Sequence, residues 1–244
     1  PEPGSSLRSK LVEVCGPQYA NSRTCCDSDQ LDDLAANIKQ VEALISSCPA
    51  CWHNFLEFFC TFTCSPDQSL FVNVTSTGTS QNNQTIVTRV DFFVDKEYGK
   101  GFYDSCKDIK FAATNGYVMD FIGGGAKDYH EMLVYLGTER PVGSPFQIDF
   151  PLEDTSGAFH PLNIAAKQCN ATDTDDRCSC VDCQSVCPLL DPTPEEKPRC
   201  TIGFISCWSF ALLLVYGGLI LGLAFAIFIK RLFDEKRDRA GFEP

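Results

Sequence analysis

The sequence predicts a disulfide-rich α+β domain, followed by a proline-rich stalk and one transmembrane helix. Thirteen cysteines lie between Cys15 and Cys187, helix-like and strand-like apolar patterns alternate among them, and an uncharged stretch of 26 residues occupies 204–229. Such cysteine density on the oxidising side of a membrane indicates a disulfide framework. We therefore expect a lumenal domain at residues 1–187, a linker at 188–203, a membrane helix at 204–229 and a cytosolic segment at 230–244.

The uncharged stretch is long enough to cross a bilayer, because at about 1.5 Å per residue it exceeds the roughly 30 Å hydrocarbon core. Its orientation follows from the distribution of Lys and Arg near its ends. Five basic residues follow it within 230–239, whereas only Lys197 and Arg199 closely precede it. The sequence therefore places the C-terminal side in the cytosol and residues 1–203 in a lumen or outside the cell.

The charge of the chain excludes some classes of partner. The formal net charge is −12, and residues 230–244 carry five basic and four acidic groups, so the rest of the chain holds −13. This acidity argues against nucleic acid and against docking onto an anionic lipid surface. Three N-x-S/T sequons fall on the predicted lumenal side and are expected glycosylation sites: Asn73, Asn83 and Asn170.

Two helices are expected early in the domain. Asp27 or Ser28 can cap the first, whose apolar residues recur at helical spacing up to Ile45. Pro49 can open the second, which has a very apolar face. Further helices are expected at 98–109 and 129–136, while residues 1–10 are expected to be a polar lead-in.

Strands are expected at 70–75, 85–94 and 146–150, where apolar and polar residues alternate. The glycine run at 123–125 predicts a hinge or a helix-terminating turn rather than a phosphate loop, because the spacing and the hydroxyl of that motif are missing. A segment with four prolines at 188–199 is typical of a semi-rigid stalk.

The cysteine count between Cys15 and Cys187 is odd, and the sequence starts without a signal peptide. We therefore expect a preceding segment that carries the signal and at least one partner cysteine. Disulfides are favoured over zinc for these cysteines, since the three histidines are scattered. No G-x-S-x-G or H-E-x-x-H motif occurs, so we expect no enzyme, no metal and no cofactor.

Thirteen phenylalanines precede the uncharged stretch. They can form an ordinary core, or part of their surface can line an apolar cavity. Composition alone leaves both interpretations open.

The segments CCDSDQLDDLAANIKQ and SSCPACWHNFLEFFCTFTCSPDQSLFVNVT closely resemble the N-terminal sterol-binding domain of the Niemann–Pick type C sterol transporters. FYDSCKDIKFAATNGYVMDFIGGGAKDY and GSPFQIDF look like the fungal branch of that family. CSCVDCQSVCP, the proline stalk and the membrane helix continue the resemblance, which runs from about residue 11 to 229.

The resemblance implies a compact lumenal domain with helices packed on a small mixed β-sheet. It implies that the domain binds a sterol, cholesterol or ergosterol, which it accepts from a soluble carrier of the Niemann–Pick type C2 kind. The sterol then passes to the rest of the transporter, which contains a sterol-sensing domain in the membrane. The expected location is the lysosomal or vacuolar membrane.

Site residues also follow from the resemblance. Gln30 matches the glutamine that contacts the sterol 3β-hydroxyl, and an amide can both donate and accept a hydrogen bond. The matching pocket residues are Leu34, Trp52, Asn54 and Phe59 on helices, Phe121 and Ile122 near the mouth, and Pro145, Phe146 and Ile148 on the strand side. The implied disulfides are Cys15–Cys60, Cys26–Cys64, Cys48–Cys178, Cys51–Cys106, Cys169–Cys183 and Cys180–Cys187, which leaves Cys25 without a partner.

The sequence departs from the family in two respects. The first cysteine-rich segment of the family is not in this chain, and two family cysteines beside the pocket mouth are replaced by the glycine run and its surroundings. One other function stays open at this point: a cysteine-rich receptor ectodomain, Frizzled-like or folate-receptor-like, that binds a protein or vitamin ligand.

Overall fold

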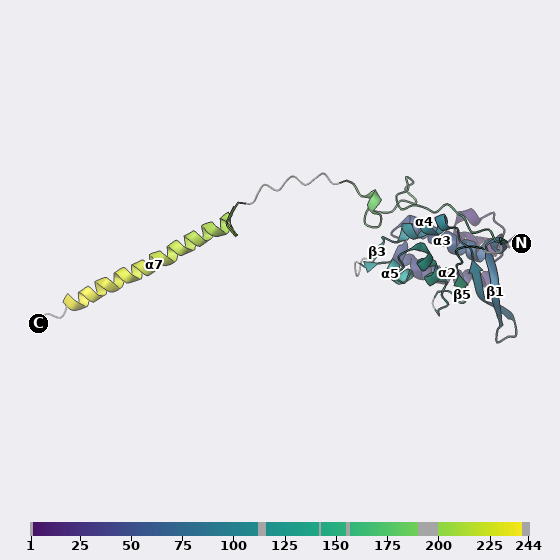
Figure 1. The fold of residues 1–244 in the computed structure, drawn as a ribbon, viewed down its shortest axis with the longest axis horizontal. Coiled ribbons are helices and arrows are strands. Elements are labelled where there is room, and N and C mark those ends of the chain that lie inside the picture. Colours follow the sequence, from purple (N-terminus) through teal and green to yellow (C-terminus); the bar gives the residue numbers. More distant parts are fainter. Residues whose placement is uncertain (1, 112–115, 142, 155–156, 190–199, 241–244) are drawn as a thin grey trace. The chain divides into compact units, whose positions relative to one another are not determined.

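The computed structural model describes residues 2–111, 116–141, 143–154, 157–189 and 200–240, with side chains in the last stretch described as far as residue 233. The chain divides into two compact units, Pro1–Pro188 and Leu189–Pro244 (Figure 1). The predicted stalk lies mostly outside the described residues, as does the end of the predicted cytosolic segment at 241–244.

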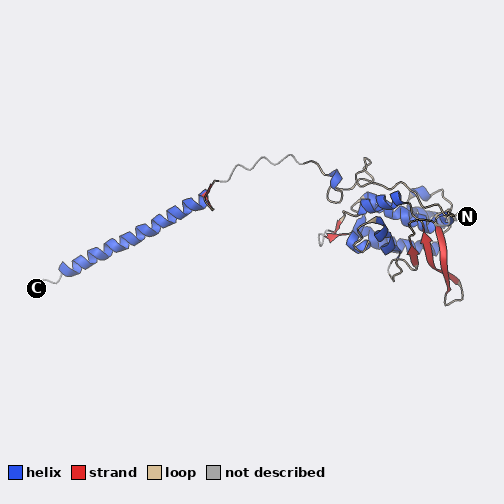
Figure 2. Ribbon diagram, viewed as in Figure 1, coloured by secondary structure: helices blue, strands red, loops and turns tan. Residues whose placement is uncertain are grey.

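The predicted fold class is confirmed. The first unit combines helices with a small mixed sheet, the second contains one long apolar helix, and seven disulfides cross-link the chain (Figure 2). The helices of the first unit are α1 (Ser5–Cys15), α2 (Ser28–Ile45), α3 (Pro49–Cys64), α4 (Lys96–Cys106), α5 (Met119–Ile122) and α6 (Tyr129–Gly137), with 3-10 turns η1 (Pro17–Tyr19), η2 (Gln68–Leu70) and η3 (Gln184–Val186).

The helix starts follow the local chemistry. Of the two residues that could cap α2, the structure has Asp27, whose carboxylate accepts from the backbone N–H of Gln30 at 2.9 Å. The Gln30 side chain in turn accepts from the N–H of Asp27 at 3.0 Å, which completes a capping box. Pro49 lies in the first turn of α3, where its missing N–H costs no hydrogen bond.

The expectation of a polar lead-in at residues 1–10 is wrong, because α1 begins at Ser5. Leu11 and Cys15, one turn apart, are fully buried, and Leu7 packs against the core. The Cys15–Cys60 disulfide attaches the end of α1 to α3. Tertiary burial of one apolar stripe therefore stabilises a helix whose polar composition suggested a loop.

The sheet has the order β1-β2-β5. Strand β1 (Val72–Thr79) pairs antiparallel with β2 (Thr85–Phe92), and β2 pairs parallel with β5 (Gln147–Asp149). Two short strands, β3 (Lys110–Phe111) and β4 (Gly116–Tyr117), pair with each other in a separate antiparallel sheet. Strand β1 ends four residues later than predicted, and β2 ends at Phe92, after which Val94 forms an isolated bridge to Leu162.

The core is built around Phe58 of α3, which is 2 % exposed. Its ring centroid lies 5.2 Å from that of Phe92, 5.5 Å from Phe102 and 6.3 Å from Phe150. Aromatic side chains from α3, α4 and the strand side therefore meet at one point. Helix α4 ends at Cys106, before the predicted end at residue 109, although Ile109 is also buried.

Cystines attach α3 to much of the first unit. In the structure the pairs are those that the resemblance implies: Cys15–Cys60, Cys26–Cys64, Cys48–Cys178, Cys51–Cys106, Cys169–Cys183 and Cys180–Cys187. Cys25 is a free, exposed cysteine. Partial desolvation of the sulfur atom by its neighbours raises the pKa of its thiol, so less of it is in the reactive thiolate form at neutral pH.

The second unit is dominated by α7 (Cys207–Ala240), in which Cys207–Phe233 is apolar and long enough to span a membrane. The helix begins three residues after the start of the uncharged stretch. A short hairpin of β6 (Thr201–Ile202) and β7 (Ile205–Ser206) precedes it. The Cys200–Cys207 disulfide, which the sequence analysis did not assign, closes this hairpin.

A buried carboxylate joins α3 to the C-terminal part of the first unit. Asp176, 6 % exposed, accepts from Lys167 Nζ at 2.7 Å and lies 2.6 Å from Nδ1 of His53. Burial opposes ionisation of Asp176, but the hydrogen bonds to Lys167 and His53 outweigh it and hold the pKa of the carboxyl below its usual value.

Asp176→Asn should lower the free energy of unfolding by about 1–3 kcal/mol at neutral pH, because it weakens two charge-assisted hydrogen bonds. A carboxyl whose pKa is depressed on folding stabilises above its unfolded pKa of about 3.9. That contribution disappears as pH falls through the lower folded-state pKa. Urea unfolding at neutral pH and below pH 4 measures both effects. Asp175→Asn, which changes an exposed neighbouring carboxylate, is the control, and an equal loss in both variants would contradict the assignment.

Candidate functional site

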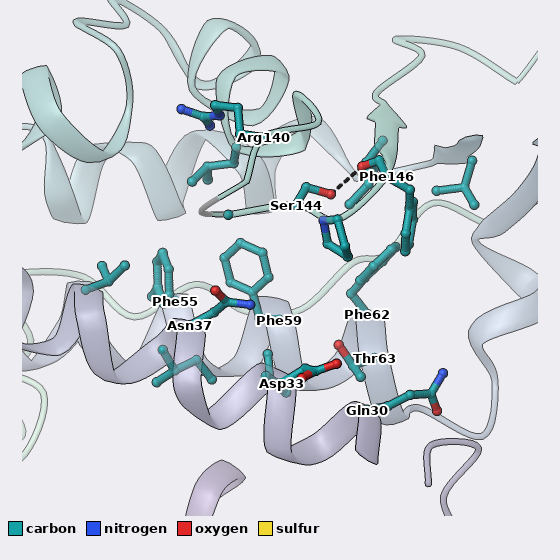
Figure 3. Close-up of a pocket in the computed structure, with 18 of the residues that line it drawn as sticks. Gln30, Asp33, Asn37, Phe55, Phe59, Phe62, Thr63, Arg140, Ser144 and Phe146 are labelled. Carbon is teal, nitrogen blue, oxygen red and sulfur yellow. Dashed lines mark hydrogen bonds between the residues drawn. The ribbon is translucent and has the colours of Figure 1, made fainter. Parts of the chain in front are cut away.

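A cavity of about 610 Å³ lies within the first unit, between α2, α3, the sheet and the connection from α6 to β5 (Figure 3). Its volume falls within the roughly 300–1,000 Å³ that is usual for small-molecule sites. It is partly open to solvent. Its walls consist mainly of apolar side chains: Leu34, Ile38, Val41, Phe55, Phe59, Phe62, Val72, Val74, Ile86, Val87, Val90, Leu136, Phe146 and Ile148.

Helical periodicity explains how two helices supply these walls. Residues three, four or seven positions apart share a helix face, so Leu34, Ile38 and Val41 line the cavity together. On α3 the rings of Phe55 and Phe59 lie 4.7 Å apart. Rigid aromatic surface from α3 therefore faces aliphatic surface from α2.

A row of polar side chains follows one edge of the cavity along α2: Gln30, Asp33, Asn37 and Gln40. Figure 3 shows the oxygens of Asp33 and Thr63 facing the cavity, whereas the amide of Gln30 is turned away from Asp33. Among the described residues no side chain or backbone group forms a hydrogen bond with the Asp33 carboxylate. A ligand hydroxyl in this part of the cavity would therefore find a free acceptor.

Gln30 has a structural role besides lining the cavity. Its Oε1 accepts the capping-box hydrogen bond from Asp27, so what remains fully available to a ligand is the amide N–H group. An amide that was expected to donate and accept is thus mainly a donor here. The nearby Asp33, one turn along the same face of α2, can supply the acceptor.

The exposed end of the cavity is formed by α5 and α6. Phe121 is 54 % exposed there, and the Arg140 guanidinium lies 3.9 Å above the centre of the Tyr135 ring. The glycine run ends α5: the N–H of Gly123 donates to Met119, and a Cβ on Gly124 would lie 2.2 Å from the Tyr135 ring. Gly124 also has a φ of +64°, so glycine is required for this close turn.

The structure brings eight of the ten sterol-contact residues inferred from the resemblance to this cavity: Gln30, Leu34, Phe59, Phe121, Ile122, Pro145, Phe146 and Ile148. Trp52 lies on the same side of α3 as Phe59, but roughly two turns nearer the helix start and outside the cavity. Asn54 is on a different face and is 2 % exposed. Its amide bonds to Ser105 Oγ at 2.9 Å and to both backbone groups of Lys167 at 2.8 Å, so it serves the core.

Many apolar lining residues were not predicted as site residues, and neither were these polar ones: Asp33, Asn37, Gln40, Thr63, Gln68, Arg140 and Ser144. Those on α2 follow Gln30 at offsets of three, seven and ten, so helical spacing could have found them. Arg140 and Ser144 come from an irregular connection, for which the sequence offers no periodicity.

The three sequons lie away from the cavity or at the surface. Asn83, at a φ of 59°, and Asn170 are exposed in turns. Asn73 is in β1 between Val72 and Val74, which line the cavity, so strand alternation directs it to the opposite face.

A second cavity of about 460 Å³ has a different character. Tyr19, Glu57 and Thr61 lie in its wall, and the Tyr19 hydroxyl is 3.3 Å from that of Thr61. Burial, with the nearby Glu57, raises the pKa of Tyr19 to about 12. Polar groups that already pair with one another suit an apolar ligand poorly.

The chain is similar in sequence to several animal proteins that are named as cholesterol transporters. The chain is 31% identical over 193 residues to the human NPC1-like intracellular cholesterol transporter 1, covering 74% of this chain and 14% of the relative. It is 28% identical over 244 residues to the rat protein of the same name (94% and 18%). It is 29% identical over 237 residues to the pig NPC intracellular cholesterol transporter 1 (89% and 18%).

These relatives are named as transporters, not as enzymes, and the chain spans less than a fifth of their length. The description of the matching protein family is "Niemann-Pick C1 N terminus", and its match extends over residues 1–207. That range includes the cavity, the cystine framework of the first unit and the start of the apolar helix. The chain belongs to the Niemann-Pick C1 N-terminal domain family.

Proposed function

We propose that the first unit binds a sterol in the 610 Å³ cavity and passes it on for intracellular sterol transport. The observation that carries this proposal is an apolar cavity with a polar row along one edge, in a domain whose relatives are named cholesterol transporters. The receptor alternative has no comparable support, because the relatives compared above are named as transporters.

The cavity suits the chemistry of a sterol, which is a rigid apolar plate with one hydroxyl group. Burial of the rings against Phe59 and Phe146 contributes about 25 cal/mol per Å² removed from water, less the cost of association. A rigid ligand loses little conformational freedom on binding. The hydroxyl needs both a donor and an acceptor, since a buried unpaired hydroxyl is costly.

The two hydrogen-bonding roles fall to neighbouring residues of α2. The Gln30 amide donates to the sterol oxygen, and the Asp33 carboxylate accepts the hydroxyl proton. Asp33 lies three positions from Gln30, and residues at that spacing have Cβ atoms about 5–6 Å apart. In the structure the Gln30 amide is turned away from Asp33, so contact of one hydroxyl with both side chains requires the Gln30 amide to rotate toward Asp33.

The full pathway extends beyond this chain. We propose that a soluble carrier of the Niemann–Pick type C2 kind delivers the sterol, and that the rest of the transporter with its sterol-sensing domain receives it. We further propose that the chain comes from the fungal branch of the family and that ergosterol is a natural ligand. The relatives reported above are animal proteins, so binding of both sterols is to be compared.

The proposed location is the lysosomal or vacuolar membrane, with the first unit in the lumen. Basic residues concentrated after the apolar helix support this orientation. The Cys200–Cys207 disulfide at the start of α7 also supports it, since disulfides persist on the oxidising side of a membrane. Glycans on Asn73, Asn83 and Asn170 are expected on the same side.

Binding of radiolabelled cholesterol and ergosterol to purified residues 1–188 tests the proposed function. Saturable binding that unlabelled sterol displaces is expected. Absence of saturable binding to folded protein would refute the assignment of this cavity to sterol.

Phe146→Ala should weaken sterol binding more than it weakens folding. Phe146 is half-buried at the cavity wall, and its ring centroid lies 6.5 Å from that of Phe62. Removal of the ring should therefore cost about 3–5 kcal/mol, divided between the free energy of sterol binding and the free energy of unfolding. Phe150→Ala is the matched control, because Phe150 is 6 % exposed and packs on Phe58 and Phe92 away from the cavity. Sterol titration and thermal melting distinguish them. Equal affinity of Phe146→Ala and wild type at a temperature where both are folded would assign Phe146 to the core alone.

Gln30→Glu should reduce sterol affinity by about 5- to 150-fold, equivalent to 1–3 kcal/mol, because it removes the N–H donor. The carboxylate keeps an oxygen for the capping box, whereas Gln30→Ala would also weaken the start of α2. Gln40→Glu, ten residues along the cavity edge, is the control for the added charge.

Asp33→Asn should reduce the preference for the 3β-hydroxyl over its epimer. Unchanged affinity and epimer preference in both site variants would place the hydroxyl elsewhere in the cavity.

A further inference from the structure

The segment directly before the apolar helix is a closed hairpin, Cys200–Cys207. Thr201 pairs with Ser206 and Ile202 with Ile205, in antiparallel register. The Cys200–Cys207 disulfide and a hydrogen bond of 3.0 Å from the N–H of Cys207 to the carbonyl of Cys200 close its base. Gly203, at a φ of +63°, allows the tight turn.

The hairpin has an apolar and a polar face. Residues directly opposite each other in antiparallel strands point to the same side. Ile202 and Ile205 therefore share one face, and Thr201 and Ser206 share the other. Ile202 is 50 % exposed, and at the turn the Phe204 side chain is fully exposed. No charged residue occurs between Cys200 and Lys230.

The length of the helix places this hairpin at a bilayer surface. Lys230 is the first charge after the apolar stretch and marks the far side. Counting back about 20 residues, the length that crosses a hydrocarbon core of roughly 30 Å, reaches Phe210. Trp208 then falls at the near interface, where tryptophan is enriched. The hairpin follows immediately outside it.

The backbone at this point is prepared for an environment with little water. Helix N-termini leave up to four N–H groups unpaired, and such groups are costly near lipid. Here the N–H of Cys207 is bonded to Cys200, and the N–H of Ser209 donates to Ser206 Oγ at 3.2 Å. The two serine hydroxyls also lie 2.9 Å apart. The hairpin thus caps the membrane helix.

We propose that Cys200–Cys207 is an interfacial membrane anchor. Its Ile202/Ile205 face and the Phe204 tip lie among the headgroups and first acyl carbons of the bilayer, and its Thr201/Ser206 face meets water. The partner is the uncharged part of the lipid surface, since the hairpin carries no charge. The disulfide holds the two faces in register, and the anchor sets the depth at which α7 starts.

Single-tryptophan fluorescence of the full chain in phosphatidylcholine vesicles tests the anchor. Trp52 and Trp208, the two tryptophans of the chain, are replaced by Phe, and one tryptophan is introduced as Ile202→Trp or as Thr201→Trp. These adjacent positions lie on opposite faces and form a matched pair. At position 202 we expect blue-shifted emission, quenching by lipids labelled near the headgroup, and several-fold weaker quenching by aqueous iodide than at 201. Equal iodide quenching at both positions, without lipid quenching, would overturn the proposal.

The role of the disulfide is tested with Cys200→Ser and Cys207→Ser in the same background. The difference between positions 201 and 202 should then largely disappear, because the hairpin is free to open. A difference that persists without the disulfide would overturn its assignment as the element that orients the anchor. Co-flotation of these variants with the vesicles shows that α7 remains inserted.

Discussion

The attachment of α3 by disulfides is the constraint on which the first unit depends. Cys48 at its start and Cys51, Cys60 and Cys64 within it join four other parts of the chain. Phe59 lies on the face of α3 that lines the cavity. Helical spacing places Cys60 and Cys64 on a different face. An empty apolar cavity destabilises a protein. Cross-links that restrict the unfolded chain offset this cost. Part of the aromatic surface of α3 can therefore line a cavity instead of packing against other core side chains.

Gln30 links folding and the proposed function in one side chain. Its oxygen completes the capping box at the start of α2, which leaves its N–H group for a ligand. This division explains why a second residue is needed at the polar end of the cavity. In the proposed site Asp33 meets that need, because it lines the cavity and forms no hydrogen bond with the described residues. A site that divides donor and acceptor between two residues can discriminate the orientation of a hydroxyl.

In the proposed anchor, the hairpin before α7 uses a disulfide in a similar way at the membrane surface. A disulfide and paired backbone groups replace the water that a helix end would otherwise need. In the first unit disulfides support an apolar cavity; in the second, one supports an apolar surface. Disulfides persist in oxidising compartments, which agrees with the proposed lumenal location.

The sequence by itself determined the features that depend on local patterns. Apolar spacing predicted α2 and α3, Pro49 predicted the start of α3, and the uncharged stretch predicted the membrane helix, whereas the cap of α2 was left open between Asp27 and Ser28. The resemblance then supplied ten candidate residues, eight of which line the cavity, but not their levels along the helices. Periodicity states which face a residue occupies, not which neighbour lies opposite it. Only the tertiary structure therefore showed that Trp52 lies beyond the cavity, that Asn54 is held in the core by Ser105 and Lys167, and that burial of Leu11 turns a polar lead-in into a helix.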